Sequence, residues 1–164
     1  MPKKNFVRDL NIGSVGEDIV SNIFKQHGID VVLNKNKDVK HDILVKYNKD
    51  FRIEVKYDLY SAKSGNVAIE FYNPKTGNNS GVAITEAELW AHIINNGESV
   101  WLTSVKKLKN FMGKTQGRII PTAGDGNAAL CLYKIEDIMP VIFYEIKNIS
   151  KEELLVILEI LLNE

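Results

Sequence analysis

The residues best suited to chemistry are two carboxylates and a lysine on consecutive short runs that alternate in polarity. Asp42 opens the first run, and Glu54, Val55 and Lys56 close the second. Because side chains of a strand alternate between its faces, Glu54 and Lys56 share one face and Val55 lies on the other. Carboxylate oxygens suit a hard divalent cation, and an ammonium group stabilises negative charge on a substrate. The pattern therefore predicts an open cleft that binds a cation.

A β-hairpin is the element that must bring these residues together. Residues 48–50 form a polar break between the two alternating runs, which is typical of a hairpin turn. A turn of this length pairs Leu44 with Glu54 and Asp42 with Lys56, so Asp42 is expected diagonally from Glu54. The core face of the hairpin is then formed by Ile43, Val45, Ile53 and Val55.

Two further glutamates are candidates for the same site. Glu17 lies in an apolar-striped helix expected to begin at Gly13 and Ser14. It stands three residues after Ser14, so it either forms a capping box or faces the hairpin, and both are compatible. Glu70 belongs to an expected strand over residues 67–72, as a cleft residue or as an ordinary exposed strand residue.

The other elements indicate an α/β fold with a mixed β-sheet flanked by helices. We expect a single domain over residues 1–164, with a core of about 12–112 and a C-terminal α/β extension of about 114–164. Residues 1–11 are interpreted as a loose basic lead-in and residues 73–81 as a mobile loop. The expected strands are 30–33, 99–103, 117–121, 128–135 and 141–146, and the expected helices are 85–97, 105–112 and 150–162.

Composition narrows the class of protein. The chain has 21 basic and 21 acidic residues and no net charge, which argues against a general polyanion binder. It lacks the apolar run of about 18 residues that a membrane span needs, and its start lacks a signal sequence. The chain has one cysteine, Cys131, in an apolar run, where it is expected to be a buried small hydrophobe. An intracellular, reducing and cytoplasmic location is therefore expected.

The order of these motifs resembles the PD-(D/E)XK nuclease superfamily, with the closest likeness to Holliday-junction-resolvase-like and small phage-encoded members. Asp42 matches the aspartate of the motif, Glu54 and Lys56 its Glu-x-Lys, and Glu17 its first-helix glutamate. His41 stands where many members have proline. The resemblance extends to about residue 112 and says nothing about the rest of the chain.

The resemblance implies a restriction-endonuclease-like sheet and a metal-dependent endodeoxyribonuclease. Mg²⁺ or Mn²⁺ would be held by Asp42, Glu54 and the carbonyl of Val55. Lys56 would position or polarise the attacking water, with a pKa that a cleft can lower, and Glu17 would hold a metal-bound water or a second ion. The target is either a junction or branched DNA, or a specific sequence as in homing and restriction enzymes.

Substrate and partners are expected to follow from surface charge and the terminal helix. The leucine-rich helix over residues 150–162 is expected to be core or a contact in a homodimer or higher homo-oligomer. The alternatives to a nuclease are a non-catalytic nucleic-acid-binding module on the same fold and an interaction protein. The alternative to a catalytic site is an exposed salt bridge on an ordinary hairpin. The candidate DNA-binding residues are Lys35, Lys37, Lys63, Lys75, Lys106, Lys107 and Lys109.

Overall fold

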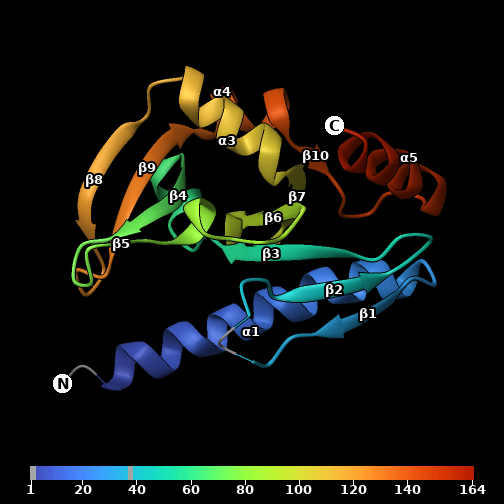
Figure 1. Ribbon diagram of the computed structural model, residues 1–164, viewed down its shortest axis with the longest axis horizontal. Helices are drawn as coiled ribbons and strands as arrows, with labels where there is room; N and C mark the ends of the chain where they lie inside the picture. Colours follow the sequence, from blue (N-terminus) through green and yellow to red (C-terminus); the bar gives the residue numbers. More distant parts are fainter. Residues whose placement is uncertain (1–2, 37–38) are drawn as a thin grey trace.

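The computed structural model describes residues 3–36 and 39–164 and shows two β-sheets with helices around them (Figure 1). The helices are α1 (Lys3–Gln26), α2 (Ser61–Ser64), α3 (Val105–Lys114), α4 (Ile135–Ile142) and α5 (Lys151–Leu162), with 3₁₀ turns η1 (Gly81–Ala83) and η2 (Asn95–Gly97). The strands are β1 (Asp30–Leu33), β2 (Ile43–Lys46), β3 (Phe51–Tyr57), β4 (Asn66–Asn73), β5 (Asn78–Asn79), β6 (Leu89–Ile94), β7 (Ser99–Ser104), β8 (Arg118–Ala123), β9 (Ala128–Lys134) and β10 (Tyr144–Glu145).

The main sheet has six strands in the order β1-β2-β3-β6-β7-β10. Adjacent strands within this sheet are antiparallel, except that β3 and β6 run parallel to each other. Parallel neighbours require a crossover, and this crossover carries α2, β4 and β5. The predicted mixed sheet flanked by helices is therefore confirmed.

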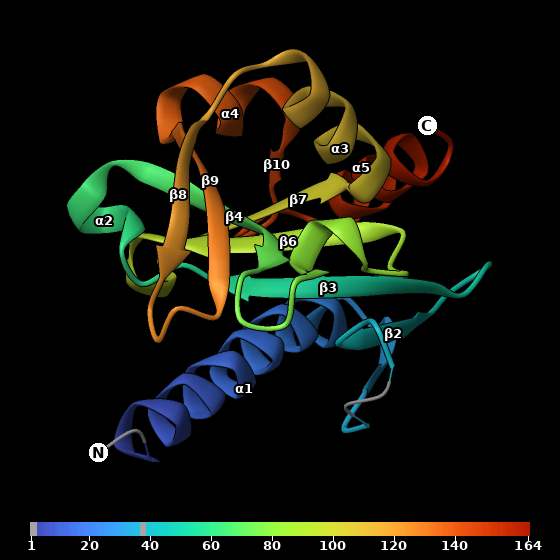
Figure 2. The ribbon, with the colours of Figure 1, turned by 60° about the vertical axis from the view of Figure 1, so that its left-hand side comes forward.

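The second sheet has the order β5-β4-β9-β8 and is antiparallel throughout. Its central pair joins the crossover strand β4 to β9, which comes much later in the chain. The end of the chain also returns to the main sheet, because β10 pairs with β7. The C-terminal segment is thus interleaved with the rest of the fold (Figure 2).

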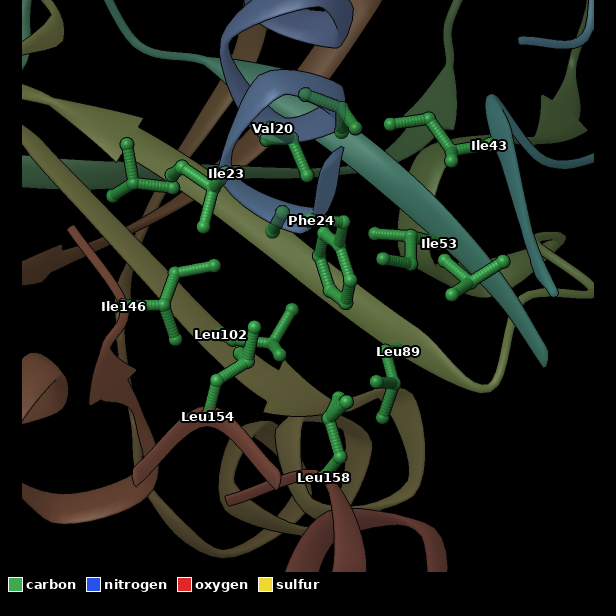
Figure 3. Packing of buried hydrophobic residues seen from close by; sticks show 14 of the residues in the cluster. Val20, Ile23, Phe24, Ile43, Ile53, Leu89, Leu102, Ile146, Leu154 and Leu158 are labelled. Carbon is green, nitrogen blue, oxygen red and sulfur yellow. The ribbon is translucent and has the colours of Figure 1, made fainter. Parts of the chain in front are cut away.

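Two hydrophobic clusters hold the sheets and helices together. The first packs Val20 and Phe24 of α1 against Ile53 of the main sheet, and it also takes in Leu154 and Leu158 of α5 (Figure 3). The second cluster lies between the opposite face of the main sheet, the second sheet, α3 and α4. The main sheet is therefore covered on both faces.

Residues 85–97 are not the predicted helix; most of their apolar residues form strand β6. Every residue of Leu89–Ile94 is buried, because this strand lies in the middle of the sheet between two covered faces. A strand buried on both faces has no polar alternation, and its short apolar run cannot be told from a helix by periodicity. The predicted capping box over residues 85–88 is absent too: Glu88 binds the guanidinium and N–H of Arg52.

Helix α1 begins at Lys3, so the predicted loose lead-in and the helix start at Gly13 and Ser14 are wrong. Ser14 lies in the helix interior, which also removes the capping-box explanation of Glu17. One glycine inside a helix costs about 1 kcal/mol, which tertiary packing readily offsets. The helix thus continues through the pair that looked like its boundary.

The last part of the chain follows the predictions more closely. The expected edge strand and its partner appear as β8 and β9, and the terminal helix α5 starts with a capping box in which Ser150 and Glu153 bond each other's backbone N–H. The expected strand over residues 141–146 is wrong in its first part, because α4 runs to Ile142 and leaves only Tyr144–Glu145 for β10.

Candidate active site

The β2–β3 hairpin forms as predicted, but with a different register. Leu44 pairs with Arg52, whereas the predicted turn would have paired it with Glu54. The connection is residues 47–50, one longer than expected. A shift of two positions keeps every side chain on its own face, so the apolar residues of both strands stay buried.

Asp42 lies just before β2 and is held against β3 by two hydrogen bonds. Its N–H donates to the Ile53 carbonyl at 3.0 Å, and its Oδ2 accepts the N–H of Val55 at 2.7 Å. The N–H and C=O of a strand residue point to the same edge, and the paired part of β2 ends at Ile43. The Val55 carbonyl therefore points toward the edge that carries the Asp42 carboxylate.

Glu54 and Lys56 form an ion pair on the face of β3 away from α1. Lys56 Nζ lies 3.0 Å from Glu54 Oε1, and the hydroxyl of Thr85 donates to Glu54 Oε2 at 3.3 Å. The side chains of Glu54 and Lys56 are 13% and 35% exposed, so solvent reaches both. The Lys56 ammonium also lies 5.8 Å from the centroid of the Trp90 ring.

Glu17 of α1 belongs to the same electrostatic cluster. Burial, and then the negative charge of neighbouring carboxylates with Asp42 first among them, raises the pKa of Glu17 to about 7. The helix approaches β3 closely here, because a Cβ on Gly16 would lie 3.3 Å from the Cβ of Tyr57. Gly16 thus permits the close packing that brings the next residue of the helix to the hairpin.

The charges in the cluster shift one another's protonation. Burial, followed by the charge of Glu54, raises the pKa of Asp42 to about 6, although the Val55 hydrogen bond and Lys56 oppose the rise. Burial alone would lower the pKa of Lys56, but the charge and hydrogen bond of Glu54 outweigh it and raise this pKa above its usual value. This direction is opposite to the lowering that the cleft was expected to cause, and it favours the ammonium form of Lys56.

The donors available for a cation are few. Within residues 3–36 and 39–164, no group of three or more His, Cys, Asp and Glu side chains is arranged to hold a metal ion. The hairpin offers the carboxylates of Asp42 and Glu54 and the carbonyl of Val55. Mg²⁺ is usually bound by one or two carboxylates while it keeps several waters. Burial is the larger cause of the raised pKa of Asp42, and the second cause, the negative charge of Glu54, also favours a bound cation, so these donors fit Mg²⁺ or Mn²⁺.

A cleft of about 410 Å³ continues the site beyond Lys56. Glu70 of β4 lines this cleft and contributes to the raised pKa of Lys56, which places it on the cleft side of its strand. Gly81 packs η1 against β4 beside it; at φ +53° a Cβ there would lie 2.2 Å from the Glu70 carbonyl oxygen. Tyr60, 77% exposed, also lines the cleft.

Sequence reasoning missed a buried polar chain at the base of this cleft. The indole N–H of Trp90 donates to His92 Nδ1 at 3.1 Å, and His92 Nε2 lies 3.4 Å from Asp58 Oδ2. Trp90 and His92 were expected on a helix, where residues two apart do not face each other. Asp58 carried a usable signal, since it lies two residues after Lys56 and strand alternation places both on one face.

The candidate DNA-binding lysines do not form one surface of free charges. The Lys106 ammonium donates to the main-chain carbonyl of Glu164. The Lys107 ammonium donates to the Glu164 carboxylate at 3.1 Å. The acidic end of the chain therefore lies against two of the candidate lysines. Lys37 lies outside the described residues. Among the candidates that Glu164 does not engage, Lys35, Lys63, Lys75 and Lys109 are exposed.

Two predictions about the rest of the chain can be compared with the structure. Cys131 is a buried free cysteine, as predicted. Among the described residues, no helix has the length and apolar character needed to span a membrane.

Comparison with known proteins adds little to this geometry. No protein-family model and no curated protein matches the chain. Among solved structures, a bacterial homing endonuclease matches at 14% sequence identity and a TM-score of 0.48, over 57% of this chain and 67% of that one. This likeness is too distant to support an argument about function.

Proposed function

We propose that the protein is a metal-dependent nuclease that hydrolyses phosphodiester bonds in DNA with a PD-(D/E)XK type of site. The observation that supports this most is the hydrogen bond from the Val55 N–H to Asp42. It fixes the carboxylate of one strand beside the Glu-x-Lys tripeptide of the next, and the carboxyl of Glu17 interacts with both. Residues singled out by their motif spacing therefore converge in space.

Each residue has a distinct task in this proposal. Asp42, Glu54 and the Val55 carbonyl hold Mg²⁺ or Mn²⁺, which when bound neutralises phosphate charge and lowers the pKa of water. Lys56 donates hydrogen bonds as an ammonium and stabilises negative charge that develops on the phosphate. Glu17 orients a water at the edge of the site.

The cleft beside Lys56 is the proposed path of the DNA strand next to the cleaved bond. An exposed aromatic ring such as that of Tyr60 offers a surface on which a base can stack. Lys63 lies on α2, close in the chain to Tyr60, and gives a cation for a flanking phosphate. Branched DNA exposes unpaired bases, so this cleft favours a structure-specific enzyme, with a sequence-specific homing- or restriction-type enzyme as the alternative.

A second copy of the chain is the proposed protein partner. Helix α5 buries Leu154, Leu158 and Leu161 in the core, yet Val156 and Ile160 on its other side are 55% and 42% exposed. Light scattering on the purified protein tests this part of the proposal. A monomer at all concentrations would contradict it without affecting the nuclease proposal.

The decisive experiment is cleavage of plasmid, branched and single-stranded DNA by the purified protein, with Mg²⁺, with Mn²⁺ and with a chelator. We expect metal-dependent cleavage that Glu54→Gln abolishes. Glu86→Gln is the matched control, because Glu86 is an exposed glutamate paired with Lys40 at 3.8 Å outside the hairpin site. DNA binding without cleavage would favour a non-catalytic binding module. A protein that neither binds nor cleaves DNA would contradict the proposal.

A further inference from the structure

Asp58 joins the end of β3 to two other elements. Its Oδ1 accepts the N–H groups of Tyr60 and Ser61, both at 3.1 Å, and its Oδ2 accepts the N–H of Ala68 in β4 at 3.0 Å. These bonds, together with His92, hold the pKa of Asp58 below its usual value despite burial. A carboxylate fixed on so many donors is a rigid anchor.

His92 is held in one orientation between this anchor and Trp90. Its side chain is fully buried, with Nε2 toward Asp58 and Nδ1 toward the indole N–H. Because Nδ1 accepts from the indole, the proton of the neutral ring belongs on Nε2, where it faces the carboxylate. The imidazole therefore transmits the position of Asp58 to Trp90.

The Trp90 ring is the surface on which the Lys56 ammonium lies. Lys56 and His92 are register partners on the parallel strands β3 and β6, as are Glu54 and Trp90. The ammonium is 5.8 Å from the ring centroid, within the range of a cation–π contact. A lysine side chain is long and flexible, so the ion pair with Glu54 alone would leave the ammonium several positions.

We propose that Asp58, His92 and Trp90 act as positioning residues that fix the Lys56 ammonium beside Glu54 for cleavage. The inference rests on the proposed nuclease function for its catalytic consequence, but the placement of Lys56 can be measured without it. None of the three residues is expected to touch the DNA phosphate. Their effect passes through Lys56, and this distinguishes them from residues that only maintain stability.

The first measurement is the NMR resonance of the Lys56 ε-methylene in protein labelled with ¹³C-lysine, assigned with Lys56→Arg. An aliphatic group over an indole ring is shifted upfield, so we expect a shifted signal in the wild type. In His92→Gln the glutamine side chain reaches Asp58 but offers no acceptor at the Nδ1 position. We expect this variant to move the Lys56 signal toward the ordinary lysine value. His92→Asn keeps an acceptor near Nδ1 and should retain more of the shift.

The second measurement is the split between kcat and KM for DNA cleavage. His92→Gln should lower kcat about tenfold with KM unchanged, and His92→Asn should recover part of the loss. Trp90→Phe keeps an aromatic ring without the N–H and covers the case in which a His92 variant does not fold. Trp101→Phe is the control for altered packing alone, because Trp101 is the cross-strand partner of His92 and its N–H has no hydrogen-bond partner among the described residues.

The outcomes separate this inference from the proposed function. An unshifted Lys56 signal in the wild type, or one that His92→Gln and Trp90→Phe leave unchanged, overturns the inference even if the protein cleaves DNA. Equal losses of kcat in His92→Gln and Trp101→Phe also overturn it. A wild type that cleaves no DNA defeats the nuclease proposal, while the NMR signal still decides whether the chain positions Lys56.

Discussion

Strands β3 and β6 present different chemistry on their two faces. Toward α1 their side chains are aliphatic, namely Ile53, Val55, Leu89, Ala91 and Ile93. Toward the second sheet the same strands present Glu54, Lys56, Trp90 and His92. The apolar face is non-directional in its packing, whereas each polar group on the other face needs a partner of defined geometry.

This difference assigns stability to one face and chemistry to the other. The apolar face sets the register and position of the strands, because slipping a strand by one residue would bury its polar side chains. The polar face gives each charge a specific neighbour, as in the interactions of Lys56 with Glu54 and Trp90. Substitutions on the two faces should therefore have separable effects.

The largest expected effect is on cleavage. Lys56→Ala should lower the rate of DNA cleavage by about 100- to 1,000-fold, because it removes a fixed cationic donor from the developing charge. Lys46→Ala, on the same hairpin but paired with Asp50 at 2.6 Å at its far end, is the matched control. Similar rates for the two variants would show that the polar face of β3 does not carry the chemistry.

Substitutions on the apolar face should lower the stability of the protein. Ile53→Ala removes a fully buried side chain and should lower the free energy of unfolding by about 2–5 kcal/mol, as seen in urea denaturation. Val15→Ala, at a half-exposed position of α1, should cost much less. A small effect at Ile53 would mean that this face does not determine the position of the hairpin.

Asp42→Asn should weaken Mg²⁺ binding by about tenfold or more, because the hard cation loses one of two anionic ligands. The asparagine oxygen can still accept the Val55 N–H, so the hairpin should keep its geometry. Titration calorimetry measures the affinity, with Asp50→Asn as the control. Unchanged affinity in the Asp42 variant would remove this residue from the metal site.

Burial and mutual repulsion of the carboxylates of Asp42 and Glu17 should make the metal-free protein less stable at higher pH. Folding raises the pKa of Asp42 from 3.8 to about 6 and that of Glu17 from 4.5 to about 7. The folded state thus holds these protons more tightly, and their contribution to stability is complete below about pH 4 and lost as the pH rises through 6 and 7. The urea midpoint should fall between about pH 5 and pH 8, and less so in Glu17→Gln. Equal falls in both proteins would place Glu17 outside the cluster.

The smallest expected effect concerns DNA affinity. Replacing Lys35, Lys63 and Lys75 by alanine should reduce the slope of log affinity against log salt by about 0.9 for each phosphate that the protein no longer binds. Lys106→Ala and Lys107→Ala should change it less, since Glu164 engages both side chains. Fluorescence anisotropy in the Glu54→Gln background measures the slope. A larger change from the α3 pair would place the DNA across α3.

The sequence by itself determined the features that depend on near neighbours in the chain. Alternation placed Glu54 and Lys56 on one face of β3, because the period of a strand is two whatever surrounds it. The capping box of α5 formed as predicted, because Ser150 and Glu153 satisfy each other's backbone within one turn. The core side of the hairpin and the buried state of Cys131 followed from hydrophobicity alone.

Only the tertiary structure decided the features that depend on distant partners. The burial of β6 on both faces removed the polar alternation that identifies a strand, so its local sequence was compatible with a helix. The bond between Asp42 and Val55 depends on where β2 ends, and the proximity of Glu17 depends on the close approach of α1 at Gly16. The polar contacts that link Asp58, His92 and Trp90 exist because β3 and β6, far apart in sequence, lie side by side. Local patterns contain no information about such pairings, since they arise from packing across the sheet.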